Sequence, residues 1–159
     1  MDKNLVRATA LATKSVIKDM IGWDLRVDGI TTKKSPANQQ IEMNVIITFN
    51  GQMSGAFILH CVEPVSAVIV SEMMGSPYEA GSADVKDAMG ELLNMISGAV
   101  KNHYQSESDP FKISVPTVVV GTDFAVHVKV KHEDEIISLA FQHDGGGEII
   151  GLKLILVSE

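Results

Sequence analysis

The sequence predicts an α+β domain in which about three helices cover an antiparallel sheet of hairpin strands. Three observations lead to this prediction: three segments repeat apolar residues at helical spacing, several others alternate apolar and polar residues, and turn-forming residues separate the strands. The chain has 159 residues, 45% of them hydrophobic and 21% charged, which is enough for a proper core. We therefore expect one domain spanning residues 1–159.

The first two helices are predicted at residues 2–21 and 64–75. Apolar residues recur at helical spacing from Leu5 onward, and Gly22 is placed to end the first helix. In the second helix, Pro64 suits the first turn and Gly75 the end.

Alternating segments predict the strands. Ile41 to Phe49 alternates strictly, Asn50-Gly51 is typical of a type I′ turn, and a return strand follows from Met53 to Cys61. Before this hairpin, residues 23–31 alternate weakly, and the polar run at 31–40 indicates a poorly ordered connection. An antiparallel meander is expected at residues 115–120, 124–131, 136–142 and 149–157, with Asp144-Gly145-Gly146-Gly147 joining the last two strands.

Four residues of the last strands, Ile136, Ile149, Ile155 and Val157, fall on faces otherwise assigned to solvent. They indicate either an apolar surface left for a partner or a second copy, or a sheet whose two faces are both covered by helices.

The third helix, at Asp84–Gln105 with Ser82 as its N-cap, has the clearest division of faces. Its apolar face must be buried and consists of Val85, Ala88, Met89, Leu92, Leu93, Ile96, Ala99 and Val100. The opposite, water-facing side consists of Asp87, Glu91, Asn94, Gly98, Lys101 and Gln105.

Gly90 and Gly98 are unexpected inside this helix, because each costs about 1 kcal/mol relative to alanine. Gly98 lies one turn after Asn94, where a missing Cβ would let another molecule's backbone come close. The alternative is a helix that merely tolerates two glycines and has a solvated polar side.

Charge and hydropathy narrow the class of protein. The formal net charge of −7 argues against a nucleic-acid partner. Arg7, Lys14 and Lys18 interrupt the first helix, so it does not resemble a signal peptide, and no run of about 18 apolar residues could span a membrane. We expect a soluble, intracellular protein.

Other chemical sites have weak support in the sequence. The five histidines show no metal-ligand spacing, and Cys61 lies in an apolar strand, as a small core residue would. Gly145-Gly146-Gly147 joins two strands, which fits a turn better than a phosphate-binding loop. Several methionines, Met73, Met74, Met89 and Met95, either line an adaptable binding surface or fill the core.

Two segments carry a resemblance to a known family. The residues from Asp87 to Gly98, DAMGELLNMISG, resemble the signature helix of the CheC/CheX/FliY chemotaxis phosphatases, whose motif is Glu-x-x-Asn, usually after a glycine. The segment ISVPTVVVG, ending at Gly121, is similar to the Ser-x-Pro segment that follows this helix in CheX-type proteins. The first helix contains no Glu-x-x-Asn, so the chain resembles the single-site CheX type.

The resemblance implies a CheC/CheX-like fold and hydrolysis of the aspartyl-phosphate on a CheY-like response regulator. Glu91 would form a salt bridge with the regulator's active-site lysine, and Asn94 would orient the attacking water. Asp87, Gly98 and Lys101 would flank the contact.

The same resemblance implies that Mg²⁺ belongs to the regulator, with no metal or cofactor held by this chain, and that the protein is a cytoplasmic homodimer. Two alternatives remain open: a non-catalytic adaptor that binds a receiver domain, and an oligomerisation module without activity.

Overall fold

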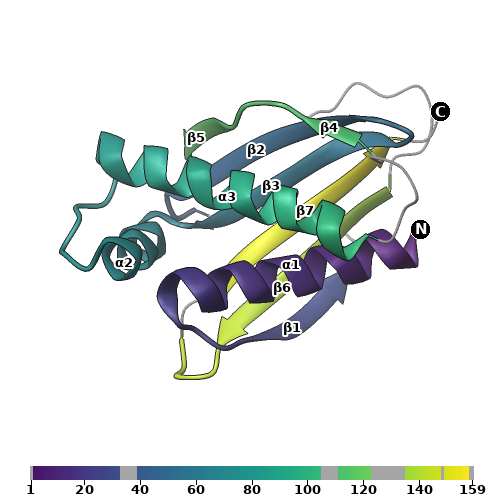
Figure 1. Ribbon diagram of the computed structural model, residues 1–159. Coiled ribbons are helices and arrows are strands. Elements are labelled where there is room, and N and C mark those ends of the chain that lie inside the picture. Colours follow the sequence, from purple (N-terminus) through teal and green to yellow (C-terminus); the bar gives the residue numbers. More distant parts are fainter. Residues whose placement is uncertain (1, 33–38, 105–110, 123–134, 148, 158–159) are drawn as a thin grey trace.

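Helices and strands form two layers, with the helices on one face of a twisted antiparallel sheet (Figure 1). The computed structural model describes residues 2–32, 39–104, 111–122, 135–147 and 149–157, and in this part of the chain three helices accompany a seven-stranded sheet. The elements in chain order are α1 Lys3–Ile21, β1 Leu25–Thr31, β2 Glu42–Gly51, β3 Ser54–Val62, α2 Glu63–Met74, α3 Ala83–His103, β4 Phe111–Ile113, β5 Thr117–Gly121, β6 Glu135–His143 and β7 Ile149–Val157. This α+β arrangement confirms the predicted fold class.

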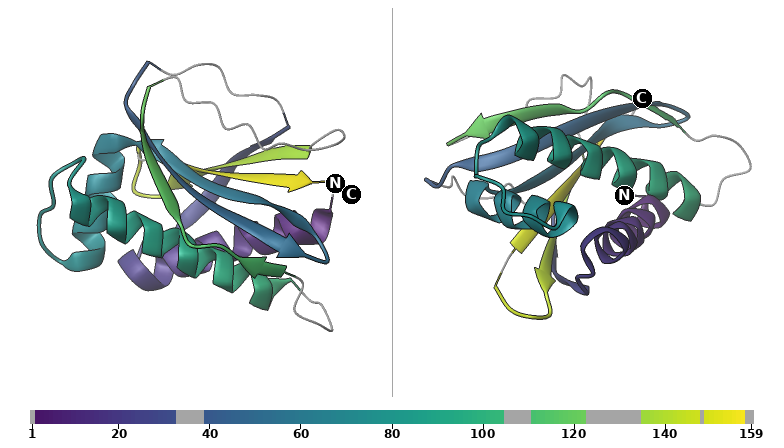
Figure 2. Two further views of the ribbon diagram at one scale, coloured as in Figure 1. Left: turned by 90° about the horizontal axis from the view of Figure 1, so that it is seen from above. Right: turned by 60° about the vertical axis from the view of Figure 1, so that its left-hand side comes forward.

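The sheet order is β1-β6-β7-β3-β2-β4, and β5 pairs with the same strand, β2, further along its length. Helices α1 and α3 pack side by side: α1 contacts β1, whereas α3 contacts β2, β3, β4 and β5. Figure 2 shows both helices on the same side of the sheet, with α2 at one end. Each long helix therefore covers its own half of the sheet.

Both ends of α1 are capped, and the Gly22 end is the one that the sequence predicts. The Asp2 carboxylate accepts hydrogen bonds from the backbone N–H groups of Asn4 and Leu5, at 2.9 and 3.1 Å. Gly22 ends the helix with φ 74°, a left-handed conformation that glycine adopts without strain. In α2, Pro64 lies in the first turn and Gly75 ends the helix in the same way, with φ 70°.

The core lies between the helices and the sheet. The alternation predicted for β2 places Met43, Val45 and Ile47 there with no exposed surface. Each such side chain contributes roughly 1.5–3 kcal/mol when it is fully buried.

The opposite face of the sheet carries a second, smaller apolar cluster of Ala56, Ile58 and Ile155, with Ile46 packed against it. Ile155 is only 3% exposed, so it is not part of a leftover surface; its face is covered within the chain at this point. Ile136 remains 37% exposed and Val157 is half-buried. The side chain of Ile149 lies outside the described part.

The turn of the first hairpin is not where the sequence predicts it. Asn50 and Gly51 belong to β2, because they pair with Lys112 and Phe111 of β4. The register between β2 and β3 centres the turn on Gln52. The prediction of a turn at Asn50-Gly51 was therefore wrong, because pairing with β4 extends β2 through both residues.

The strand predicted at residues 115–120 is present as β5, and a short strand that was not predicted, β4, precedes it; Ser114, Val115 and Pro116 separate the two. Proline cannot donate to a strand ladder, which explains the interruption. The Gly-rich turn between β6 and β7 is present, with positive φ at Gly146 and Gly147. The strand predicted at residues 124–131 and most of the connection at 31–40 lie outside the described residues.

Candidate functional site

Helix α3 is fixed in place by its apolar side and by its ends. Six residues of this side have no exposed surface: Val85, Met89, Leu92, Leu93, Ile96 and Val100. The Ser82 hydroxyl accepts a hydrogen bond from the N–H of Val85 at 3.3 Å, which confirms the predicted N-cap. At the other end, the Tyr104 hydroxyl donates to the Asp2 carboxylate at 2.9 Å, which ties α3 to the start of α1.

Glu91 and Asn94 lie on the outer side of this helix, as the periodicity predicts. Glu91 is exposed and Asn94 is half-buried. A spacing of three residues places them about 4.5 Å apart along the helix axis, on neighbouring turns. Within the described residues, neither side chain has a hydrogen bond or ion pair, so a carboxylate and a carboxamide are both available to a partner or to water.

The three flanking residues differ in their surroundings. Asp87 is exposed on the turn before Glu91. Lys101 is half-buried, with its ammonium group 5.6 Å from the ring centroid of Phe111 in β4, a cation–π distance. Lys101 therefore lies against its own chain as well as beside the site.

The two glycines of α3 have different neighbours. A Cβ added to Gly90 would lie 3.4 Å from Cγ of Pro116, which is ordinary van der Waals contact. A Cβ added to Gly98 would meet no atom within 4 Å among the described residues. The packing of the described chain therefore does not require glycine at position 98.

The segment between β4 and β5 is held firmly beside α3. The Ser114 N–H donates to the Thr48 carbonyl at 2.8 Å, and the Thr48 N–H donates to the Ser114 hydroxyl at 3.0 Å. Pro116 then packs against Gly90. Between these two anchors, Val115 is left 82% exposed.

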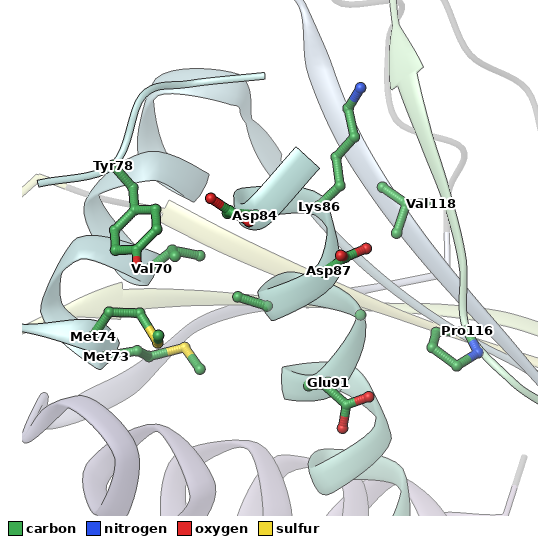
Figure 3. Close-up of a pocket in the computed structure, with 12 residues that line it drawn as sticks. Val70, Met73, Met74, Tyr78, Asp84, Lys86, Asp87, Glu91, Pro116 and Val118 are labelled. Atoms are coloured by element: carbon green, nitrogen blue, oxygen red, sulfur yellow. The ribbon is translucent and has the colours of Figure 1, made fainter. Parts of the chain in front are cut away.

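A cleft of about 650 Å³ surrounds the N-terminal half of α3 (Figure 3). Its polar lining includes Asp84, Lys86, Asp87 and Glu91. Its apolar lining comes from α3 itself, from α2 and the loop after it, and from the β5 region, and consists of Val70, Met73, Met74, Tyr78, Ala88, Gly90, Pro116 and Val118. The cleft thus brings Glu91 and Asp87 together with α2, with the loop that precedes α3, and with the segment of Pro116 and Val118 that follows α3.

Sequence reasoning found only part of this lining. Tyr78 and Lys86 carry no periodicity or motif that marks them, and the sequence segment that contains Val118 does not show that it packs beside α3. The methionines divide between the two roles: Met89 is fully buried in the core, whereas Met74 and Met95 are 57% and 40% exposed. The unexplained Gly90 was the one available signal that another segment packs closely on α3.

The other reactive groups lie away from this helix face. Cys61 is buried in the core, where burial raises the pKa of its thiol to about 12, so it stays protonated and unreactive. Burial also lowers the pKa of His60 to about 4. Among the described residues, no group of three or more His, Cys, Asp or Glu side chains could hold a metal ion. No helix in the same part of the chain is long and apolar enough to cross a membrane.

Comparisons with solved structures show the fold. A CheC-like superfamily protein from Shewanella sp. PV-4 is 22% identical with a TM-score of 0.82, covering 99% of this chain and 100% of that chain. CheX from Desulfovibrio desulfuricans is also 22% identical, with a TM-score of 0.80 and coverage of 96% and 98%. A chain of the CheX–CheY–BeF3–Mg²⁺ complex from Borrelia burgdorferi is 18% identical, with a TM-score of 0.80 and coverage of 96% and 97%.

The sequence was also compared with models of protein families and with curated proteins. No curated protein matches the chain. Residues 43–141, which include the Glu91/Asn94 helix and the Pro116 segment, match the model described as chemotaxis phosphatase CheX. The resemblance found in the sequence is confirmed: the chain belongs to the CheX family of chemotaxis phosphatases.

Proposed function

We propose that this protein hydrolyses the aspartyl-phosphate of a CheY-like response regulator, with Glu91 and Asn94 as its active pair. The observation that carries the proposal is the position of these two side chains, both accessible on a helix whose other side is buried. Membership of a phosphatase family and the likeness to a CheX that forms a complex with CheY support it.

In the proposed encounter, α3 lies across the regulator's phosphorylation site. The Glu91 carboxylate pairs with the regulator's active-site lysine, which fixes the position of the helix. The Asn94 amide then reaches the phosphoryl group, where its oxygen accepts a hydrogen bond from one water molecule and directs that water's oxygen toward phosphorus.

The reaction needs little chemistry from this chain. The water oxygen bonds to phosphorus as the bond to the aspartyl oxygen breaks, leaving a free aspartate on the regulator and inorganic phosphate, with the water proton passing to phosphate or solvent. Mg²⁺ held by the regulator would neutralise charge on the phosphoryl oxygens. In this proposal, α3 holds the regulator in place and orients the attacking water, and a site made of one carboxylate and one amide is enough for both roles.

The direct test measures phosphate loss from a phosphorylated CheY-like regulator in the presence of this protein. Asn94→Ala should lower kcat by roughly 100-fold with a small change in KM, because a positioned water is lost at the reacting centre. Glu91→Gln should chiefly raise KM, because the salt bridge is lost.

Matched variants control for the substitutions themselves. Asn102→Ala changes an exposed asparagine on the same helix, and Glu72→Gln changes an exposed glutamate on α2. Both should leave kcat and KM unchanged. If the regulator binds but the lifetime of its phosphate is the same with and without the protein, the protein is an adaptor and the phosphatase proposal is wrong.

We also propose that residues 1–159 form one domain that acts as a cytoplasmic homodimer. The exposed Ile136 on the outer sheet face supports an apolar contact between copies. Sedimentation that shows only monomers at micromolar concentration would contradict the dimer.

A further inference from the structure

Three carboxylates follow one another along α3 inside the cleft. Asp84, Asp87 and Glu91 are all exposed, and their spacing places each on the turn after the last. Among the described residues, none of the three forms an ion pair or a side-chain hydrogen bond. We call them the acidic ridge.

The like charges of the acidic ridge lower the stability of α3. Like charges three or four residues apart destabilise a helix by about 0.2–0.5 kcal/mol per pair. The positive end of the helix dipole offsets this for Asp84 in the first turn, but Glu91 lies beyond the reach of that effect. A cation from outside the chain would relieve this repulsion and would be attracted by all three carboxylates.

Apolar side chains border the ridge on both sides. Figure 3 shows Met73, Met74 and Tyr78 on one side of the helix and Pro116 and Val118 on the other. Met74 is 57% exposed and unbranched, so it can adapt its shape to a side chain laid against it. The cleft therefore offers negative charge between two apolar walls.

We propose that this cleft selects the regulator, by binding a surface element of its receiver domain that places a basic side chain beside an apolar one. The inference rests on the proposed function, since Glu91 is shared by the active pair and the acidic ridge. The basic side chain lies over Asp84 and Asp87, and the apolar side chain packs against Met74.

The lining argues for this occupant over other kinds of ligand. An anion is repelled by the three carboxylates, and Lys86 is the only cationic side chain that the described residues contribute to the cleft lining. A purely apolar ligand would desolvate those carboxylates without pairing them, which is costly. A protein surface with one basic and one apolar group meets both halves of the lining.

The test measures binding apart from catalysis. The probe is a CheY-like receiver domain loaded with BeF3 and Mg²⁺, and its Kd for the protein is measured by titration calorimetry. Met74→Gln and Asp84→Asn should each raise Kd at least threefold, and Asp84→Asn should also reduce the dependence of Kd on salt concentration. Val68→Gln is the matched control, because Val68 is an exposed apolar residue of α2 outside the cleft, and it should leave Kd unchanged.

The same variants separate this inference from the proposed function in a phosphate-release assay. Met74→Gln and Asp84→Asn should raise KM and leave kcat as in the wild type, whereas Asn94→Ala lowers kcat. Unchanged Kd in both cleft variants, with normal thermal unfolding, overturns the inference even if the wild type is an active phosphatase. Weaker binding by both variants supports it even if phosphate release is absent.

Discussion

Replacement of Gly98 by alanine should make the protein more stable and less active. The stabilisation follows from the open space at this position, where an added Cβ meets no described atom within 4 Å. With no clash to offset it, the helix gains the full propensity difference, about 0.8–1.0 kcal/mol in the free energy of unfolding. For a protein of this size, that corresponds to a rise in Tm of roughly 2–4 °C.

The loss of activity follows from the proposed docking. If the regulator's backbone lies against Gly98, a methyl group there overpacks the contact at a cost of roughly 1–3 kcal/mol, which is at least about fivefold in kcat/KM. Urea unfolding measures the first effect, and phosphate release from the regulator measures the second.

A stabilised protein with normal activity would be hard to reconcile with a role for Gly98 in docking. Ser15→Ala controls for stabilisation alone, because Ser15 is exposed on α1 and its replacement also raises helix propensity. It should increase stability by a few tenths of a kcal/mol without changing kcat/KM. A lower free energy of unfolding for Gly98→Ala would show that a Cβ does not fit at this position without a clash.

Three further predictions concern the fold. Burial lowers the pKa of His60 to about 4, so the unfolded chain binds a proton more readily than the folded chain does. The free energy of unfolding therefore falls as the pH decreases from about 6.5 toward 4. Between pH 7 and 5, urea unfolding should show a decrease that is about 2 kcal/mol smaller in His60→Gln than in the wild type. Tyr104→Phe removes the hydrogen bond to Asp2 and should lower the free energy of unfolding by about 0.5–1.5 kcal/mol, seen as an earlier urea midpoint with the same slope. Cys61, whose pKa burial raises to about 12, should not react with thiol reagents at pH 8 in the folded protein and should react fully in guanidinium chloride; labelling of the folded protein would show that the strand opens.

Elements with local signals could be predicted from the sequence. The apolar period of α3, its Ser82 cap and the left-handed Gly22 and Gly75 are all properties of short segments, and the structure has them as expected. The outward position of Glu91 and Asn94 follows from the same period. The helix face of the candidate site was therefore visible before the fold was known.

Features that depend on distant pairings could not be predicted in this way. Asn50-Gly51 is a typical turn sequence, but Gly51 belongs to β2 because it pairs with Phe111, sixty residues later in the chain. Ile155 alternates like a solvent-facing residue, yet it is 3% exposed and clusters with Ala56 and Ile58 of β3. The cleft has the same origin, because Met74 and Pro116 meet around α3 only through the strand order of the sheet.

The division of the sheet between two helices has a consequence for crowding. Strand β1, under α1, is four strand spacings from β2, under α3, which is roughly 19 Å across the sheet. Among the described strands, β1 pairs only with β6, and a molecule that attaches along the other side of β1 would not touch the face of α3 that carries Glu91 and Asn94. If the proposed regulator binds at α3, each protomer of an oligomer joined along β1 would keep that binding face open.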